Sequence, residues 1–243
     1  MEPRSIDISA RDVHVWTLRK FLDVPASERA PLCKDELQRL ARFTFDSGQR
    51  EYFNTRLLVR QTLSRYADVE PAAWRFSFNE HGRPAICYPE KLSDLRFNVS
   101  HTRGLIAVAV TRDIDVGIDV EVINRLRDPV AIADRFFAAD EVAALRALPP
   151  EAQRERFFAY WTLKEAYIKA RGLGLAIPLG SFAFDIETHA IRIAFSAPTV
   201  DSPSAWQFMR RSLSPIHRFA MAVRCDVHDT VNVRFEETEV TPR

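Results

Sequence analysis

Residues 153–157 read Gln-Arg-Glu-Arg-Phe, and residues 49–53 read Gln-Arg-Glu-Tyr-Phe. Each stretch opens a segment whose apolar residues recur at spacings of three and four, which is the pattern of an amphipathic helix. We therefore predict helices over residues 49–66 and 151–171, and Gly172 is expected to end the second one. The strands that follow each of these two helices can therefore be compared with each other.

Similar strands follow the two predicted helices in the same order. A Phe-x-Phe strand comes first, and an Ala-x-Ala-Val strand comes later. The matching segments are residues 76–78 and 107–110 after the first helix, and residues 182–184 and 220–223 after the second. The repeated order predicts an α+β fold made of two similarly built subdomains, residues 1–115 and residues 116–243. Because clefts between domains are favoured places for ligands, we expect the active site at the seam between these halves.

The composition is that of an ordinary globular protein. The chain has 243 residues, of which 47% are hydrophobic and 28% are charged, and this mixture excludes a disordered chain. The net charge of +1 gives no overall attraction to nucleic acid or to a membrane surface, so neither is predicted as a partner. The three cysteines are widely spaced, as in a protein with reduced thiols, and no export signal is recognised. We therefore expect a cytoplasmic location.

The first candidate for chemistry is the segment Gly117-Ile118-Asp119-Val120-Glu121. Since a strand alternates its faces, Asp119 and Glu121 point to the same side while their apolar neighbours point into a core. Two carboxylates on one face offer oxygen ligands to a hard cation such as Mg²⁺. The plainer alternative is a solvent-exposed face that carries two acidic residues.

The second candidate is Trp161-Thr162-Leu163-Lys164-Glu165-Ala166-Tyr167-Ile168-Lys169. Glu165 and Lys169 are four residues apart and share one helix face with Trp161. The alternative is a surface ion pair, which adds only a few tenths of a kcal/mol to helix stability. The aromatic residues along the helix favour burial, and a charged pair on a buried helix would need a functional reason.

Polar residues close to a predicted strand end form the third candidate. Asn98, Ser100 and His101 can donate hydrogen bonds to an oxyanion, and His101 can become cationic near neutral pH. The alternative is a polar turn that is capped by its own side chains. A Ser–His nucleophile is not favoured, because the chain has no Gly-x-Ser-x-Gly elbow.

Several arginines, among them Arg39 and Arg83, are suited to hold a phosphate because their planar guanidinium binds it through two hydrogen bonds. Most arginines of the chain are expected on solvated helix surfaces. No Walker-type phosphate loop and no Gly-x-Gly-x-x-Gly motif is present.

Together, these segments resemble the Sfp-type 4′-phosphopantetheinyl transferases. The family pattern is a Gly-[Lys/Arg]-Pro turn, then Phe-Asn-x-Ser-His, then Gly-[Ile/Val]-Asp-x-Glu, and then Trp-x-x-Lys-Glu-[Ala/Ser]-x-x-Lys. The matching segments here are residues 82–84, 97–101, 117–121 and 161–169. The resemblance covers about residues 35 to 225, and it implies a monomer with the pseudo-dimeric fold of the family.

The resemblance also implies a reaction. The enzyme would move the phosphopantetheine arm of coenzyme A onto a serine of an apo carrier protein and release adenosine 3′,5′-bisphosphate. Asp119, Glu121 and Glu165 match the residues that hold Mg²⁺, which bridges to the pyrophosphate. Lys169 matches a lysine that contacts the phosphates. Glu165 also matches the proposed general base, although ligating a metal and accepting a proton compete for one carboxylate.

For the substrates, the resemblance implies further contacts. Ser100 and His101 match residues that contact the coenzyme A phosphates, and Asn98 belongs to the same motif. Arg83 and Arg39 match basic residues that hold the nucleotide end. The carriers of the family present their serine on an acidic helix, and residues 127–137 are a candidate docking segment.

Two other classes of protein remain possible from the sequence. One is a non-catalytic module that binds coenzyme A or a nucleotide, and the other is a Mg²⁺-dependent phosphohydrolase. The acidic residues distinguish the transferase from the binding module, because a module that only binds has no need of them. A phosphohydrolase would break down coenzyme A without any carrier.

Overall fold

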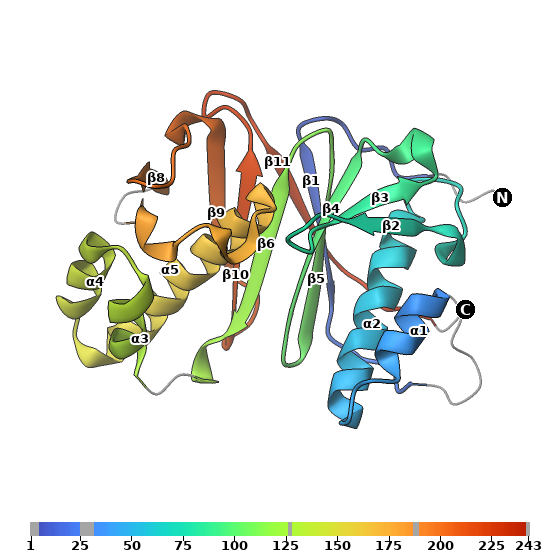
Figure 1. Cartoon of the computed structure of the whole chain (residues 1–243), viewed down its shortest axis with the longest axis horizontal. Coiled ribbons are helices and arrows are strands. Elements are labelled where there is room, and N and C mark those ends of the chain that lie inside the picture. Colours follow the sequence, from blue (N-terminus) through green and yellow to red (C-terminus); the bar gives the residue numbers. More distant parts are fainter. Residues whose placement is uncertain (1–4, 25–31, 126–127, 187–189, 242–243) are drawn as a thin grey trace. The chain divides into compact units, whose positions relative to one another are not determined.

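The computed structural model describes residues 5–24, 32–125, 128–186 and 190–241. The chain packs as two compact units (Figure 1). The first contains Met1–Phe78, Pro84–Asp113 and Val231–Arg243, and the second contains Asn79–Arg83 and Ile114–Thr230. The chain thus enters the second unit close to the predicted division after residue 115, but its last segment returns to the first unit. Among the described residues, no helix combines the length and the apolar character needed to cross a membrane.

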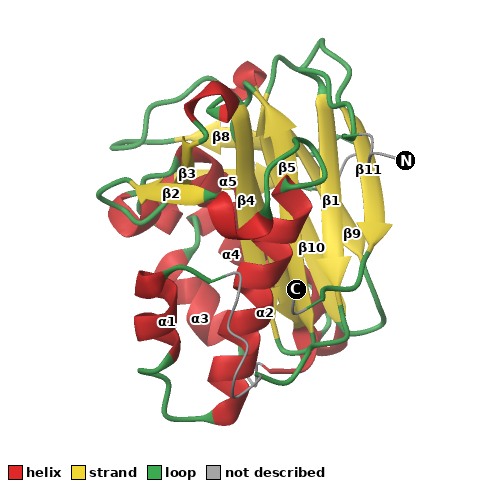
Figure 2. Cartoon of the chain, turned by 90° about the vertical axis from the view of Figure 1, so that its right-hand side faces the viewer, coloured by secondary structure: helices red, strands yellow, loops and turns green. Residues whose placement is uncertain are grey.

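The first unit is built on a sheet with the strand order β11-β1-β5-β4. β1 pairs in parallel with β11 and antiparallel with β5, and β4 pairs antiparallel with β5. The elements are β1 (Asp12–Leu18), α1 (Lys34–Leu40), α2 (Asp46–Leu63), β2 (Arg75–Phe78), β3 (Pro84–Tyr88), β4 (Leu95–Thr102), β5 (Leu105–Arg112) and β11 (Asn232–Glu237). α2 lies against β4 and β5 and buries its apolar stripe there (Figure 2).

The second unit has a three-stranded antiparallel sheet with the order β6-β10-β9 and a separate hairpin of β7 and β8. The elements are β6 (Val116–Val122), α3 (Pro129–Phe136), α4 (Ala139–Arg146), α5 (Pro150–Arg171), β7 (Phe182–Asp185), β8 (Arg192–Phe195), β9 (Trp206–Ser212) and β10 (His217–Arg224). α5 packs on β6 and β10, as Figure 1 shows. It ends at Gly172, which adopts the left-handed conformation with φ of 65°.

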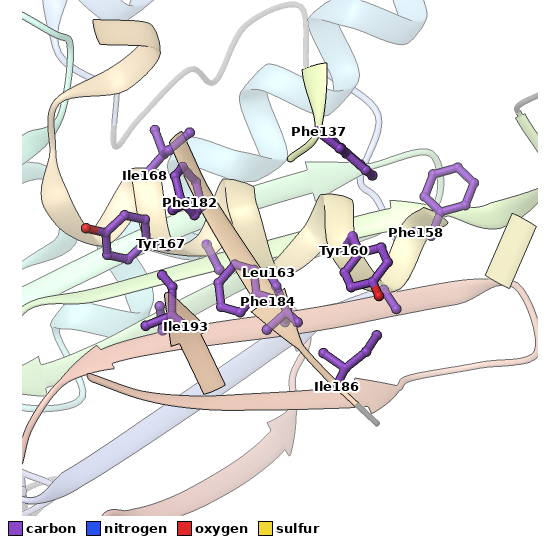
Figure 3. Packing of buried hydrophobic residues seen from close by; sticks show 14 of the residues in the cluster. Phe137, Phe158, Tyr160, Leu163, Tyr167, Ile168, Phe182, Phe184, Ile186 and Ile193 are labelled. Carbon is purple, nitrogen blue, oxygen red and sulfur yellow. The ribbon is translucent and has the colours of Figure 1, made fainter. Parts of the chain in front are cut away.

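The core of the second unit is rich in aromatic side chains (Figure 3). Tyr160 and Tyr167 of α5 are buried, and the ring of Tyr167 contacts Phe182 of β7 and Trp206 of β9. These contacts hold α5 between the hairpin and the three-stranded sheet. The predicted helix over residues 151–171 is therefore a buried element, as its aromatic residues indicated.

The two units share one order of elements. In each unit a strand is followed by helices, then a two-stranded hairpin, then two antiparallel strands. The strand orders β1-β5-β4 and β6-β10-β9 correspond position by position. The segments of the sequence repeat fall on matching elements, with residues 49–53 in α2 and residues 153–157 in α5. The predicted α+β class is confirmed.

Candidate active site

Gly117 allows α5 to approach β6 at backbone distance. A Cβ atom added at Gly117 would lie 2.0 Å from the carbonyl oxygen of Ala166 and 2.3 Å from the backbone nitrogen of Ala170. Side chains two residues apart on a strand share a face, so Asp119 and Glu121 are on the side of β6 that α5 covers. The absence of a side chain at Gly117, together with the small side chains of Ala166 and Ala170, therefore brings segment 117–121 close to the helix that carries Glu165.

Asp119 lies at the centre of this contact. Its side chain is buried, which excludes the alternative of a solvent-exposed acidic face at this position. The Lys169 ammonium donates to Asp119 Oδ1 at 2.7 Å and to the Ile118 carbonyl oxygen at 3.1 Å. Lys169 thus links the last turns of α5 to β6, rather than acting as a simple surface partner of Glu165.

Glu165 lies one helical turn before Lys169 and is half-buried. Its burial raises the pKa of its carboxyl, and the nearby Asp119 charge raises that pKa further, while Lys169 opposes the shift. The carboxyl groups of Asp119 and Glu165 are therefore close enough for one charge to disfavour the other. A bound cation would relieve this repulsion.

The donor set fits a hard divalent cation. Asp119 and Glu165 supply carboxylate oxygens, which Mg²⁺ prefers, and Mg²⁺ commonly uses only one or two protein carboxylates. Glu121 is on the same strand face and is partly exposed. In the described ranges, no three His, Cys, Asp or Glu side chains form a group that could hold a metal ion. The three predicted ligands are thus not assembled as a cluster, and the metal assignment stays a prediction.

Arg83 lies in the turn between β2 and β3, as predicted, and it belongs to the second unit, where its guanidinium contacts other residues of that unit. It donates to the Ala170 carbonyl oxygen at 2.8 Å and forms an ion pair with Asp115 at 2.8 Å. Asn79 of the same turn donates to the carbonyl oxygen of Gly172 at 2.7 Å. These side chains satisfy carbonyl groups at the end of α5, which carries Lys169.

The polar motif of β4 places its residues on two faces of the strand. Asn98 and Ser100 are buried on one face, while His101 is on the other and is exposed. His101 Nδ1 lies 2.9 Å from the carboxylate of Glu51 in α2. A protonated His101 would form an ion pair with Glu51, so a phosphate at this position would compete with that carboxylate.

Arg39 is exposed at the end of α1, and its guanidinium carbon lies 5.9 Å from the centre of the Tyr52 ring. Arg56 lies on the same ring at 5.1 Å. The predicted site residues are divided between the two units. The first unit contains Arg39, Asn98, Ser100 and His101. The second unit carries Arg83, Asp119, Glu121, Glu165 and Lys169.

The candidate docking segment is only partly described. Arg127 lies outside the described residues, whereas residues 129–136 form α3. Phe136 at the end of α3 is 49% exposed, which is unusual for a large apolar side chain next to a buried core. The assignment of this segment to carrier docking stays a prediction.

Sequence reasoning missed Lys164, Asp115 and Glu51. Lys164 is completely buried and forms an ion pair with Glu141 of α4 at 2.7 Å. Asp115 and Glu51 are the partners of Arg83 and His101. Lys164 lies in the segment 161–169, where its position beside Glu165 could have drawn attention to it, and Glu51 lies in the repeat over residues 49–53, which gives no sign of a partner. The other two partners become visible only in the folded chain.

Two family models match this chain. The model of the 4′-phosphopantetheinyl transferase superfamily matches residues 115–223. The model described as 4′-phosphopantetheinyl transferase, N-terminal, matches residues 27–113. The two matches together include every residue that the sequence assigned to the site.

Two relatives of similar sequence point to the same family. The chain is 37% identical over 179 residues to the 4′-phosphopantetheinyl transferase HetI of Nostoc sp., covering 72% of this chain and 75% of that protein. It is 31% identical over 186 residues to the 4′-phosphopantetheinyl transferase Sfp of Bacillus subtilis, covering 74% and 78%. The structural match to the crystal structure of Thermotoga maritima holo-[acyl-carrier-protein] synthase has 20% identity, covers 46% of this chain and 64% of that chain, and has a TM-score of 0.38.

Proposed function

This chain belongs to the 4′-phosphopantetheinyl transferase superfamily, and on that premise we propose that it transfers the 4′-phosphopantetheine group of coenzyme A to a serine of an apo carrier protein. The serine oxygen forms a bond to the phosphorus that bears the pantetheine arm. The bond from this phosphorus to the bridging oxygen of the pyrophosphate breaks, and adenosine 3′,5′-bisphosphate leaves. The serine proton passes to a base on the enzyme or to water.

The observation that carries the proposal is the junction of Asp119, Glu165 and Lys169 between β6 and α5. Asp119 and Lys169 are joined at 2.7 Å, and the charge of Asp119 raises the pKa of Glu165. A module that only binds coenzyme A has no need for a buried and a half-buried carboxylate placed this close together. Their repulsion favours a site that takes up a cation.

We propose that Asp119 and Glu165 hold Mg²⁺, with Glu121 as a third ligand. When bound, Mg²⁺ neutralises charge on the pyrophosphate. Lys169 is proposed to contact the phosphates, for which its ammonium would turn from Asp119. Glu165 is also proposed to receive the serine proton, directly or through water, and its raised pKa supports this second role.

Coenzyme A itself is proposed to contact Arg39, Arg83, Asn98, Ser100 and His101. The position of His101 supports a role in binding, because its side chain is exposed and its Nδ1 lies 2.9 Å from the Glu51 carboxylate, a contact that a phosphate oxygen could replace. Arg83 would have to keep or exchange its contacts with Asp115 and Ala170. The position of the site at the seam, the monomeric state and the cytoplasmic location stay predictions.

Incubation with coenzyme A, Mg²⁺ and an apo carrier protein, followed by intact-mass measurement, tests the proposal. We expect the carrier to gain the mass of one phosphopantetheine group. Asp119→Ala and Glu165→Ala are expected to lower the rate at least about 100-fold, because each removes charge stabilisation of the reacting phosphate. Glu151→Ala is the matched control, since Glu151 is exposed in the first turn of the same helix, and it should transfer at the wild-type rate.

A measurement of melting temperature tests Mg²⁺ binding independently of the transfer activity. Mg²⁺ should raise the melting temperature of the wild-type protein and of Glu151→Ala, but not that of Asp119→Ala. Acyl and peptidyl carriers that all keep their mass would overturn the proposal. Breakdown of coenzyme A without a carrier would indicate a phosphohydrolase instead, and binding without any turnover would indicate a binding module.

A further inference from the structure

One carboxylate joins the end of α5 to the segment before β9. Asp201, between β8 and β9, accepts on its Oδ2 atom a hydrogen bond from the Tyr167 hydroxyl at 2.9 Å and another from the Arg171 guanidinium at 2.5 Å. Trp206 Nε1 of β9 donates to the same oxygen at 2.9 Å. A single oxygen atom therefore binds two side chains of α5 and one of the sheet.

This carboxylate and its partners are shielded from water. The Asp201 side chain is 12% exposed, while Tyr167 and Trp206 are buried with their ring centres 5.0 Å apart. Figure 3 shows the Tyr167 hydroxyl pointing away from the labelled apolar side chains. Burial disfavours the charged form of Asp201, but the hydrogen bonds that it accepts, first from the Ser202 backbone, and the Arg171 charge lower its pKa. The hydrogen bonds to Asp201 at neutral pH are therefore charge-assisted.

Tyr167 and Arg171 lie on the helix face opposite to the candidate site. An α-helix turns by about 100° per residue, so residues four apart share a face, and the residue midway between them lies on the other side. Lys169 is that residue, and its ammonium donates to Asp119 of β6. The end of α5 is therefore held by β6 on one face and by Asp201 on the opposite face.

Lys169 lies in a part of α5 that needs support from outside the helix. It belongs to the last turn, where carbonyl groups lack partners within the helix and the backbone opens most easily. Arg83 supports the backbone there through the carbonyl oxygen of Ala170. Asp201 instead holds side chains of the same region. Loss of its carboxylate would release those side chains and allow the last turn to move.

We propose that Asp201 is a positioning residue for the transfer reaction. Through Tyr167 and Arg171 it fixes the last turn of α5, which sets the position of the Lys169 ammonium. The inference rests on the proposed function, because it concerns the side chain that is proposed to contact the phosphates. A purely structural role would differ in one respect. A loss of stability lowers activity whatever residue stands at position 169, whereas positioning acts only through the lysine.

A double-mutant cycle tests this role. Asp201→Ala should lower kcat/KM for coenzyme A about tenfold, because a cation displaced by a fraction of an ångström stabilises the reacting phosphate less well. The KM for the carrier should stay within about twofold of the wild-type value. In the Lys169→Ala background, Asp201→Ala should add less than about a twofold further loss, because the group that it positions is gone.

Hydrogen exchange measures the end of α5 without any turnover. In Asp201→Ala, the amides of residues 168–172 should exchange at least about tenfold faster, while those of residues 156–162 in the same helix should keep their protection. Tyr167→Phe removes only the hydroxyl and should show both effects to a smaller degree. Asp201→Asn keeps an oxygen that accepts hydrogen bonds, so it should recover part of the lost rate.

The matched control removes another ion pair of α5. Glu155 accepts two hydrogen bonds from Arg218 of β10, and it lies about 21 Å along the helix from Lys169. Glu155→Ala should therefore keep the wild-type kcat/KM and the wild-type exchange at the end of α5. Melting temperatures check that every variant is folded under the assay conditions.

Three results would overturn the inference. One is an equal loss from Asp201→Ala with and without Lys169, and another is unchanged exchange at residues 168–172. The third is a loss of rate in the control as large as that in Asp201→Ala. In each of these cases the wild-type protein still transfers, so the proposed function stands. A wild-type protein that modifies no carrier would instead overturn the proposed function, and the positioning role with it.

Discussion

Gly117 leaves no room for a side chain, because the backbone of α5 occupies the place where a Cβ atom would be. We predict that Gly117→Ala lowers the free energy of unfolding by about 2–4 kcal/mol, since two backbone segments would have to separate. The same separation would move Lys169 away from Asp119, so the transfer rate should fall as well. Urea denaturation measures the loss of stability.

Gly180 provides the control for this substitution. A Cβ atom added there would lie 3.6 Å from the nearest backbone oxygen, which is an ordinary contact. Gly180→Ala should therefore change the free energy of unfolding by less than about 1 kcal/mol. A Gly117→Ala protein as stable as the Gly180→Ala protein would contradict the close approach of α5 to β6.

His14 of β1 predicts a dependence of stability on pH. Burial lowers the pKa of its imidazole below 6.5, and its Nδ1 lies 2.9 Å from the hydroxyl of Tyr66. Since Trp16 donates to the same hydroxyl, the Tyr66 O–H is available to donate a hydrogen bond to Nδ1 of a neutral His14. The unfolded chain binds a proton more readily than the folded one, so this stabilisation is present above pH 6.5 and is lost as pH falls through the lower folded value.

Denaturation at pH 8, 6.5 and 5 measures the effect of His14. His14→Gln should show a shallower loss of stability between pH 6.5 and pH 5 than the wild-type protein, because glutamine does not titrate. Identical slopes in the two proteins would show that His14 does not set this dependence.

Among the elements, α4, α5 and β7 are joined by one buried ion pair. Lys164 of α5 contacts Glu141 of α4 at 2.7 Å and donates to the Phe182 carbonyl oxygen at 2.6 Å. Glu141 also accepts from the backbone nitrogen of Phe184 at 2.9 Å. Burial lowers the pKa of Lys164 and raises the pKa of Glu141, because desolvation disfavours both charged forms.

This pair predicts opposite outcomes for single and double substitutions. Lys164→Met should cost about 3–5 kcal/mol of stability, because it leaves Glu141 buried without its cation. Lys164→Met combined with Glu141→Leu should recover part of that loss, since no unpaired charge is left buried, while the Phe182 carbonyl and the Phe184 N–H still lose their partners. Thermal and urea denaturation of the three proteins measures the coupling, and additive losses would contradict it.

In the whole molecule, the first unit is made from both ends of the chain. β11 pairs in parallel with β1 over Asp12–Thr17, and Val240 is buried in the core of that unit. Removal of residues 231–243 should therefore expose the edge of β1 and destabilise the first unit more than the second. Hydrogen exchange should become faster in β1 and β5, and aggregation should increase. Unchanged protection of β1 would contradict this prediction.

The local sequence was sufficient for many elements. The helices α2 and α5 follow from apolar periodicity, and β6 follows from alternation. The repeat that begins at residues 49–53 and again at residues 153–157 predicted two similarly built halves, because equivalent elements keep equivalent apolar patterns. The strand β11 was not predicted. Its residues are exposed or only half-buried, and they gain their partner only from β1, far away along the chain.

The sequence by itself determined the candidate residue types and the elements that hold them. A carboxylate on an alternating strand and a Glu–Lys spacing on a helix are local properties, so Asp119, Glu165 and Lys169 were identified without coordinates. Only the tertiary structure decided their partners: Lys169 contacts Asp119, His101 contacts Glu51, Arg83 contacts Asp115, and Lys164 contacts Glu141. Such pairs depend on backbone approach between segments distant in sequence, and the space left by Gly117 is what permits the first of them.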